Sequence, residues 1–293
     1  MVIMHSGRER AFFLLLIAPA VVVVMVLTVF PVFSVASNSL FDFDYIAGTR
    51  ELVGFDNYRS ILSDRQFLQS IGNTAIFVAL AVLLETGVGF AIALLLYKPF
   101  RGSRIVSLTA MAPMMLSTMV VSATWRTMFH FDIGVLNSLL ERFGLSPVRW
   151  LIDPDIALFS IVLVDVWQWT PFAFIILSAA LRTLPPEYLE AARIDGSGTL
   201  GLLRHIIVPL MASHLLTVAM LRTIDTFRLF SKVYALTGGG PGNATETISY
   251  FIHREAFSYF NLGRAGAASM VAFILIAVVA LIYIPRLLRE NAV

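Results

Sequence analysis

The sequence predicts an all-α membrane protein whose helices cross the bilayer six times. Two properties of its composition carry this prediction: 58% of the 293 residues are hydrophobic, and only 14% are charged. So few charged residues cannot cover the surface of a water-soluble domain of this length. The third observation is that the apolar residues gather in runs of about 20 or more, the length that a helix needs to cross roughly 30 Å of hydrocarbon. We therefore expect residues 1–293 to form one membrane domain.

Six apolar runs have the required length. The expected spans are about Ala11–Val35, Thr74–Tyr97, Ile105–Met128, Ile156–Leu181, Ile206–Leu236 and Gly266–Leu288. The first run follows two arginines, as the apolar core of a signal peptide does, but it is longer than the roughly 7–15 residues of such a core. We interpret it as a retained anchor.

Basic residues beside the spans predict the orientation of the chain. Lys and Arg occur before the first span, between the second and third, between the fourth and fifth, and after the sixth. The other loops carry their basic residues together with acidic ones. The positive-inside rule therefore places both termini and the loop of residues 184–205 in the cytoplasm, with the spans in the cell membrane.

The cytoplasmic loop between the fourth and fifth spans has the sequence EAARIDGSGTLGLLRHIIVPL over residues 190–210. Pro186 and Glu187 predict a helix start, because proline is tolerated in a first turn and a carboxylate favours the positive end of the helix dipole. Gly196 predicts the end of this helix, because glycine adopts the left-handed conformation. A second helix should follow and bend at Pro209. Such a helix pair suits docking of a soluble partner; the alternative is an amphipathic helix that rests on the lipid headgroups.

This loop resembles the EAA signature of permease subunits of bacterial binding-protein-dependent ABC importers. The matching residues are Glu190, Ala191, Ala192, Gly196, Ile206, Val208 and Pro209, with valine where leucine is commoner. The segment from Phe227 to the sequence ALTGGGP of residues 235–241 resembles the carbohydrate branch of the family, of the maltose, glycerol-phosphate and trehalose permease type. Trp167 with the sequence TPF of residues 170–172 is a third, looser match. The resemblance is to the short, six-span members of this branch.

The resemblance implies how this chain is coupled to its partners. It assigns Glu190, Ala191, Ala192, Asp195 and Gly196 to a coupling helix that docks on a cytoplasmic ATPase subunit. It further implies a second permease subunit, two ATPase subunits that bind ATP and Mg²⁺, and an extracytoplasmic solute-binding protein.

The chain itself carries no signature of an ATPase. The sequence has no G-x-x-x-x-G-K-[ST] motif, and Lys98 and Lys232, its only lysines, lie outside glycine-rich segments. We therefore expect no catalytic residue, no metal site and no cofactor in this chain. The basic residues are scattered at span ends, which favours a lipid bilayer over nucleic acid as their partner.

Polar and aromatic residues inside the fourth and fifth spans are the candidate solute contacts, because burying polar groups in a membrane is costly. They are Asp165, Trp167, Gln168, Trp169, Thr170, Asp225, Thr226, Arg228 and Phe230. Aromatic rings can cover the C–H faces of a sugar while carboxylates and amides bind its hydroxyls. Pairing of Asp225 with Arg222 or Arg228, each three residues away, is an equal alternative. Glu85 is expected to bond another helix.

We therefore predict the permease subunit of an ATP-driven importer that translocates a sugar or sugar-like solute, and no enzyme. The alternative is a secondary, ion-coupled transporter, although the two halves of the chain show no convincing internal repeat. An intramembrane enzyme is disfavoured, because the sequence lacks H-E-x-x-H and G-x-S-x-G motifs.

Overall fold

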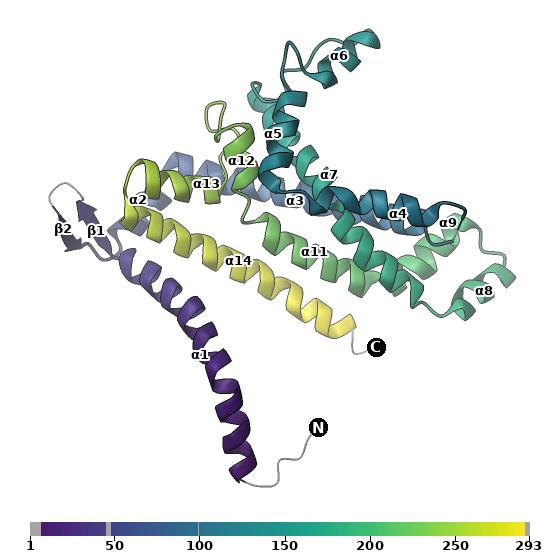
Figure 1. The fold of residues 1–293 in the computed structure, drawn as a ribbon, viewed down its shortest axis with the longest axis horizontal. Helices are drawn as coiled ribbons and strands as arrows, with labels where there is room; N and C mark the ends of the chain where they lie inside the picture. The colour runs from purple at the N-terminus through teal and green to yellow at the C-terminus, as the bar shows by residue number, and fades with distance from the viewer. Residues whose placement is uncertain (1–6, 45–47, 99, 291–293) are drawn as a thin grey trace. The chain divides into compact units, whose positions relative to one another are not determined.

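The computed structural model describes residues 7–44, 48–98 and 100–290 of the chain. The chain forms two compact units, one made of Met1–Asp64 with Ile252–Phe273 and the other of Arg65–Phe251 with Ile274–Val293. Helices make up nearly all of the regular structure in both units (Figure 1). The predicted all-α class is therefore confirmed.

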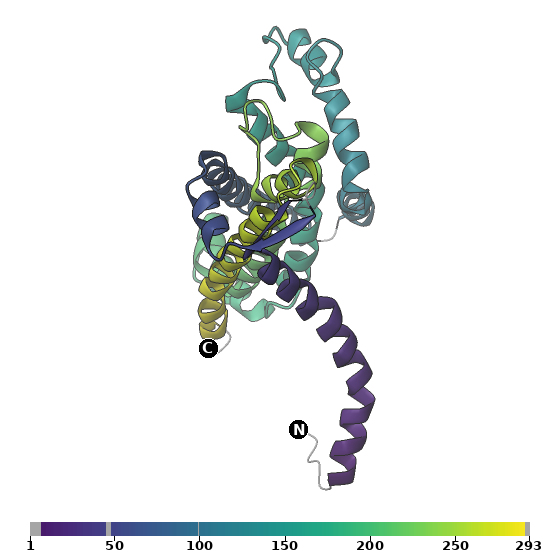
Figure 2. The same ribbon diagram turned by 90° about the vertical axis from the view of Figure 1, so that its left-hand side faces the viewer.

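The first unit is built on a long apolar helix, α1, which Figure 2 shows as one continuous, gently curved ribbon. The elements of this unit are α1 (Gly7–Asn38), β1 (Phe41–Asp44), β2 (Thr49–Leu52), α2 (Asp56–Leu62), the π-helical turn η3 (Arg254–Ser258) and the first part of α14 (Leu262–Glu290). The strands, which the sequence analysis did not predict, form an antiparallel hairpin with Phe41 opposite Leu52. The Arg50 guanidinium lies 3.7 Å from the centre of the Phe41 ring, which stabilises the hairpin by a cation–π contact.

The second unit contains the remaining helices. They are α3 (Arg65–Leu95), α4 (Ser103–Met111), the 3₁₀ turn η1 (Ala112–Met115), α5 (Thr118–Met128), α6 (Val135–Arg142), α7 (Pro154–Arg182), α8 (Pro186–Ile194), α9 (Thr199–Leu202), the π-helical turn η2 (Leu203–Ile207), α10 (Val208–Leu210), α11 (Ala212–Thr226), α12 (Ser231–Leu236) and α13 (Ile248–His253). The last two residues of α13 belong to the first unit, and the second part of α14 belongs to this one.

Helices α3 and α7 pack along each other in the core of the second unit. Phe77 of α3 and Ile161 and Leu177 of α7 are fully buried there. Gly89 permits the close approach of the two helices, because a Cβ atom at this position would lie 2.7 Å from the Cβ of Ala173. Small residues at such crossings let helix backbones approach closely in membranes. This core carries the polar residues of the candidate site.

In the part of the chain that the structure describes, four helices are long and apolar enough to cross a membrane without interruption. They are Phe12–Asn38, Arg65–Leu95, Pro154–Arg182 and Leu262–Tyr283. They overlap the first, second, fourth and sixth predicted runs, of which the fourth lies wholly within its helix. Two bent helix pairs raise the number of candidate spans to six if each pair counts as one.

The third predicted span, expected as one helix over 105–128, is broken. Ser103–Met115 and Thr118–Met128 meet at an angle of 97°. Pro113 lies in the 3₁₀ turn before the bend. Its ring has no N–H to donate and clashes with the carbonyl one turn earlier, which favours a break in the helix at this point.

The fifth predicted span, expected over 206–236, is broken twice. It first bends by 65° between Thr199–Leu210 and Ala212–Thr226, immediately after Pro209, as that proline predicts. The second break separates α11 from α12 at residues 227–230, whose sequence FRLF contains neither proline nor glycine. Local backbone chemistry therefore does not explain the second break.

Candidate functional site

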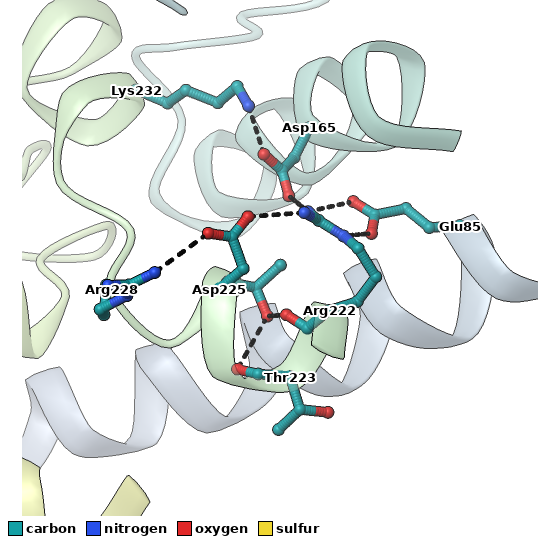
Figure 3. Close-up of polar contacts among 8 residues, drawn as sticks. Glu85, Asp165, Arg222, Thr223, Asp225, Arg228 and Lys232 are labelled. Carbon is teal, nitrogen blue, oxygen red and sulfur yellow. Dashed lines mark hydrogen bonds and ion pairs between the residues drawn. The ribbon is translucent and has the colours of Figure 1, made fainter. Parts of the chain in front are cut away.

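A buried guanidinium joins three helices of the second unit. Arg222 of α11 donates from Nε and Nη2 to the two carboxylate oxygens of Glu85 on α3, at 2.5 and 3.2 Å (Figure 3). Its Nη2 also lies 3.4 Å from Asp165 of α7, and its Nη1 lies 2.6 Å from Asp225. The guanidinium carbon is 4.9 Å from the centre of the Trp169 ring. Arg222 is thus held by three carboxylates and one aromatic ring.

Two further cations complete this network, which we name the charge network. Lys232 of α12 donates from Nζ to the second oxygen of Asp165, and Arg228 lies 3.3 Å from the second oxygen of Asp225. Three carboxylates therefore face three cations, and the sum of their charges is zero. This balance matters because an unpaired charge inside a protein or a membrane is strongly unfavourable.

The charge network runs from the interior of the second unit to its surface. The side chains of Glu85 and Lys232 are 0% and 1% exposed, whereas those of Asp225 and Arg228 are 45% and 68% exposed. Only the Asp225–Arg228 end can therefore reach a solute from outside the core. The ion pairs of Asp225 with both arginines, which the sequence left open, are confirmed.

Two predicted solute contacts have partners within the chain in this structure. Asp165 is buried with both oxygens in ion pairs, so its carboxylate belongs to the charge network and is not open to a solute. Thr226 is also buried, and its hydroxyl donates to the Arg222 carbonyl at 2.7 Å, one helical turn earlier.

Gln168 and Thr170 have buried polar atoms without a hydrogen-bond partner among the described residues. The Gln168 amide nitrogen donates to the Leu116 carbonyl at 3.0 Å, beside the bend of the third span, and its Oε1 is unpaired. The Thr170 hydroxyl is buried and unpaired among the described residues. Thr170 is one of the residues that line a cavity of about 670 Å³ between α3, α4 and α7. Such atoms bind water or a ligand, since leaving them unpaired is costly.

The predicted aromatic contacts lie in different places. Trp167 is 41% exposed and lines both the 670 Å³ cavity and a neighbouring one of about 310 Å³. Trp169 covers Arg222, as described above. Phe230 lies in the second break of the fifth span, with its ring centre 5.4 Å from that of Tyr234. Trp167 and Phe230 therefore remain candidates for solute contact, and Trp169 is occupied by the network.

The sequence analysis missed the role of Lys232 and the partner of Glu85. In the sequence, Lys232 is notable only because it lies outside any glycine-rich, phosphate-binding loop. The available signal was the count of charges inside the apolar runs, because each buried cation requires a carboxylate. That count indicates that partners exist, but not which helix supplies them.

The second group of predicted residues forms the helix–turn–helix of α8 and α9. α8 ends at Ile194, and Gly196 follows with φ of +77° in the left-handed region. The Ser197 amide donates to the Ala192 carbonyl at 2.9 Å, which closes the helix end as a Schellman motif does. The helix start at Pro186 and its glycine stop are both as predicted.

α8 divides its residues between a packed side and an exposed side. Leu189 and Ala192 are buried against Leu202 of α9. The exposed residues include Glu190, Ala191, Asp195 and the large apolar side chains Tyr188 and Ile194. An exposed mixture of charged and large apolar groups is a surface on which another protein can dock.

Comparison with known proteins identifies the family. Residues 85–290 match the family described as binding-protein-dependent transport system inner membrane component. The chain is 36% identical over 280 residues to the trehalose/maltose transport system permease protein MalF of Thermococcus litoralis, covering 94% of each chain. It is 30% identical over 284 residues to the sulfoquinovosyl glycerol transport system permease protein SmoG of Agrobacterium fabrum, covering 97% of this chain and 92% of that one.

A solved structure shares the fold. A chain in the crystal structure of a bacterial ABC transporter involved in the import of the acidic polysaccharide alginate superposes with a TM-score of 0.82, covers 96% of both chains and is 20% identical. The family match over residues 85–290, the two relatives that align over more than 90% of both chains and the shared fold agree. The chain belongs to the family of inner membrane components of binding-protein-dependent transport systems.

Proposed function

We propose that this chain is the permease subunit of an ATP-driven ABC importer that carries a sugar or a sugar-like solute across the inner membrane. The observation that carries the proposal is the 36% identity, over 94% of the chain, to a trehalose/maltose permease. A relative named for trehalose transport, SugA of Mycobacterium tuberculosis, is 30% identical over the same share of the chain.

The exposed end of the charge network is the proposed solute contact on this chain. Asp225 accepts and Arg228 donates hydrogen bonds, and both are exposed on the second unit. A carboxylate and a guanidinium together match hydroxyl groups, which both donate and accept. Phe230, in the same break as Arg228, supplies a ring for C–H faces. Trp167 and Thr170 are further candidates, which line the separate 670 Å³ cavity. Disaccharides, oligosaccharides, polyols, glycerol phosphates and acidic sugars all match this chemistry.

The exposed side of α8 is the proposed docking surface for an ATPase subunit. The complete importer has a second permease subunit, two ATPase subunits that bind ATP and Mg²⁺, and an extracytoplasmic solute-binding protein, while this chain binds no cofactor. Closure of the ATPase pair on ATP pushes Glu190, Ala191 and the Gly196 turn inward, and the spans then open the solute cavity outward. Hydrolysis resets the spans.

The energy source separates this proposal from its alternative, an ion-coupled transporter. Uptake is measured in vesicles that keep an ion gradient but lack ATP. An ABC importer stops under these conditions, whereas continued uptake would contradict the proposal.

The solute contact is tested with Asp225→Ala. We expect uptake to fall roughly tenfold, because one unmet polar group costs about 1–3 kcal/mol and about 1.4 kcal/mol corresponds to a factor of ten. ATP hydrolysis stimulated by the loaded binding protein should fall less, since α8 is untouched. The matched control is Asp56→Ala, which removes the carboxylate of an exposed pair with the same spacing, Asp56–Arg59.

The double variant Asp225→Ala/Arg228→Ala decides between solute contact and simple ion pairing. If Asp225 only balances the charge of Arg222 and Arg228, removing Asp225 together with Arg228 keeps the charge network balanced and restores uptake. If the exposed pair binds the solute, the double variant is as defective as Asp225→Ala or more so. Restored uptake would remove Asp225 from the solute site.

A further inference from the structure

The second break of the fifth span is fixed by side chains from other helices. α11 ends at Thr226 and α12 begins at Ser231, and the four residues between them include Arg228. Because these residues contain neither proline nor glycine, a continuous helix is open to them as an alternative. Contacts from outside the segment must therefore select the broken form.

Asp165 contacts both sides of this break. One of its carboxylate oxygens lies 3.4 Å from Nη2 of Arg222, on the last turns of α11, and the other accepts from Lys232, on the first turn of α12 (Figure 3). All three residues are buried. A single carboxylate on α7 thus contacts the end of α11 and the start of α12, which no helical hydrogen bond connects to each other.

A second buried contact satisfies the backbone inside the break. The Thr247 hydroxyl, which is fully buried, donates to the Leu229 carbonyl at 2.8 Å. A carbonyl that leaves a helix loses its usual partner, and this hydroxyl replaces it. The broken form is therefore stabilised both by an ion pair and by an uncharged hydrogen bond.

We propose that Asp165 and Lys232, assisted by Thr247, are positioning residues that hold the break at residues 227–230 open and so aim Arg228 and Phe230 at the solute. The proposal rests on the proposed function for the identity of the cargo. Asp165, Lys232 and Thr247 are buried and do not touch the solute. They act through the backbone of the break, whose exposed residues make the contact.

The rival role of Asp165 and Lys232 is charge neutralisation alone, and a charge-balanced variant separates the two. Asp165→Asn/Lys232→Met removes one negative and one positive charge and leaves the buried Glu85–Arg222 pair intact. Neutralisation predicts that this variant behaves as the parent in every assay. Positioning predicts a variant that folds and assembles but whose break is no longer held.

The position of the break is measured directly with spin labels. The chain has no cysteine. In an importer whose partner subunits also carry none, cysteines introduced at Leu221 of α11 and Ala235 of α12 are the only labelled positions. In the assembled importer in lipid nanodiscs, we expect a narrow distance distribution for the labelled parent and a wider or shifted one for Asp165→Asn/Lys232→Met. An unchanged distribution overturns the proposal, whatever the transport assays show.

Transport provides the second readout. We expect uptake by the charge-balanced variant to fall roughly tenfold, the loss of about one solute hydrogen bond, while ATP hydrolysis stimulated by the loaded binding protein stays within about twofold. Uptake equal to that of the parent overturns the proposal. If the parent itself imports no sugar, the proposed function fails, and the label distances still test the positioning role separately.

A neutral pair of variants keeps the test valid if the charge-balanced variant does not assemble. Thr247→Val removes only the hydroxyl at nearly constant volume, and Thr247→Ser retains it. We expect the valine variant to widen the label distances and lower uptake, and the serine variant to restore both. Parent-like distances in Thr247→Val, or an equal defect in Thr247→Ser, contradict the proposal.

Discussion

The Glu85–Arg222 pair should show strong energetic coupling. Replacing Glu85 with glutamine leaves Arg222 with its other two carboxylates, so we expect the lower end of the cost of breaking a buried pair, about 3 kcal/mol. Replacing Arg222 with methionine leaves Glu85 without its two hydrogen bonds and close to another carboxylate, so we expect the upper end, about 5 kcal/mol. The double variant Glu85→Gln/Arg222→Met keeps the charges balanced. It should therefore cost no more than Arg222→Met alone.

The free energies of unfolding are measured by titrating the purified chain in mixed micelles with a denaturing detergent. The two single costs add to about 8 kcal/mol, so a double variant near 5 kcal/mol gives a coupling of about 3 kcal/mol, the upper end for residues in contact. The control is Arg59→Met, which breaks a pair whose side chains are 84% and 71% exposed and should leave stability unchanged. An additive double variant would refute the role assigned to the charge network.

Three further predictions address orientation, coupling and packing. A reporter fused after Arg101 should be cytoplasmic and one fused near Asn243 external; the reverse would contradict the orientation. Gly196→Pro should leave the chain inserted in the membrane but lower transport and co-purification of the ATPase, because proline cannot adopt a φ of +77°. A variant complex that assembles and transports at the parental rate would exclude α8 as the coupling helix. Gly89→Ala should lower stability by about 1–3 kcal/mol, because its Cβ would lie 2.7 Å from a Cβ of α7, whereas Gly87→Ala, with nothing within 4 Å, should not.

Features that depend on local chemistry could be predicted from the sequence. The membrane class follows from run length, and the ends of α8 follow from Pro186 and Gly196, because helix starts and stops are set by a few adjacent residues. The bend after Pro209 was predicted for the same reason. The break after Pro113 was not, because an apolar run long enough to span a membrane also favours one continuous helix.

Features that depend on packing could not be predicted. The pairing of Arg222 with Asp225 follows from their spacing on one helix, and the structure confirms it at 2.6 Å. Glu85 is 137 positions from Arg222, and Asp165 is 67 positions from Lys232. Which buried carboxylate meets which cation depends on how α3, α7, α11 and α12 pack, so the sequence does not place Asp165 in the charge network.

The bend of the third span restricts where lipid can lie. Met115, Leu116 and Ser117 at this bend are exposed, and chain that leaves a helix presents peptide groups that hydrocarbon tails cannot hydrogen-bond. The Leu116 carbonyl accepts a hydrogen bond from the amide of Gln168, which lies in the interior of the protein. We therefore expect water or a neighbouring protein, rather than lipid tails, beside the peptide groups of Met115–Ser117 that the chain itself does not pair.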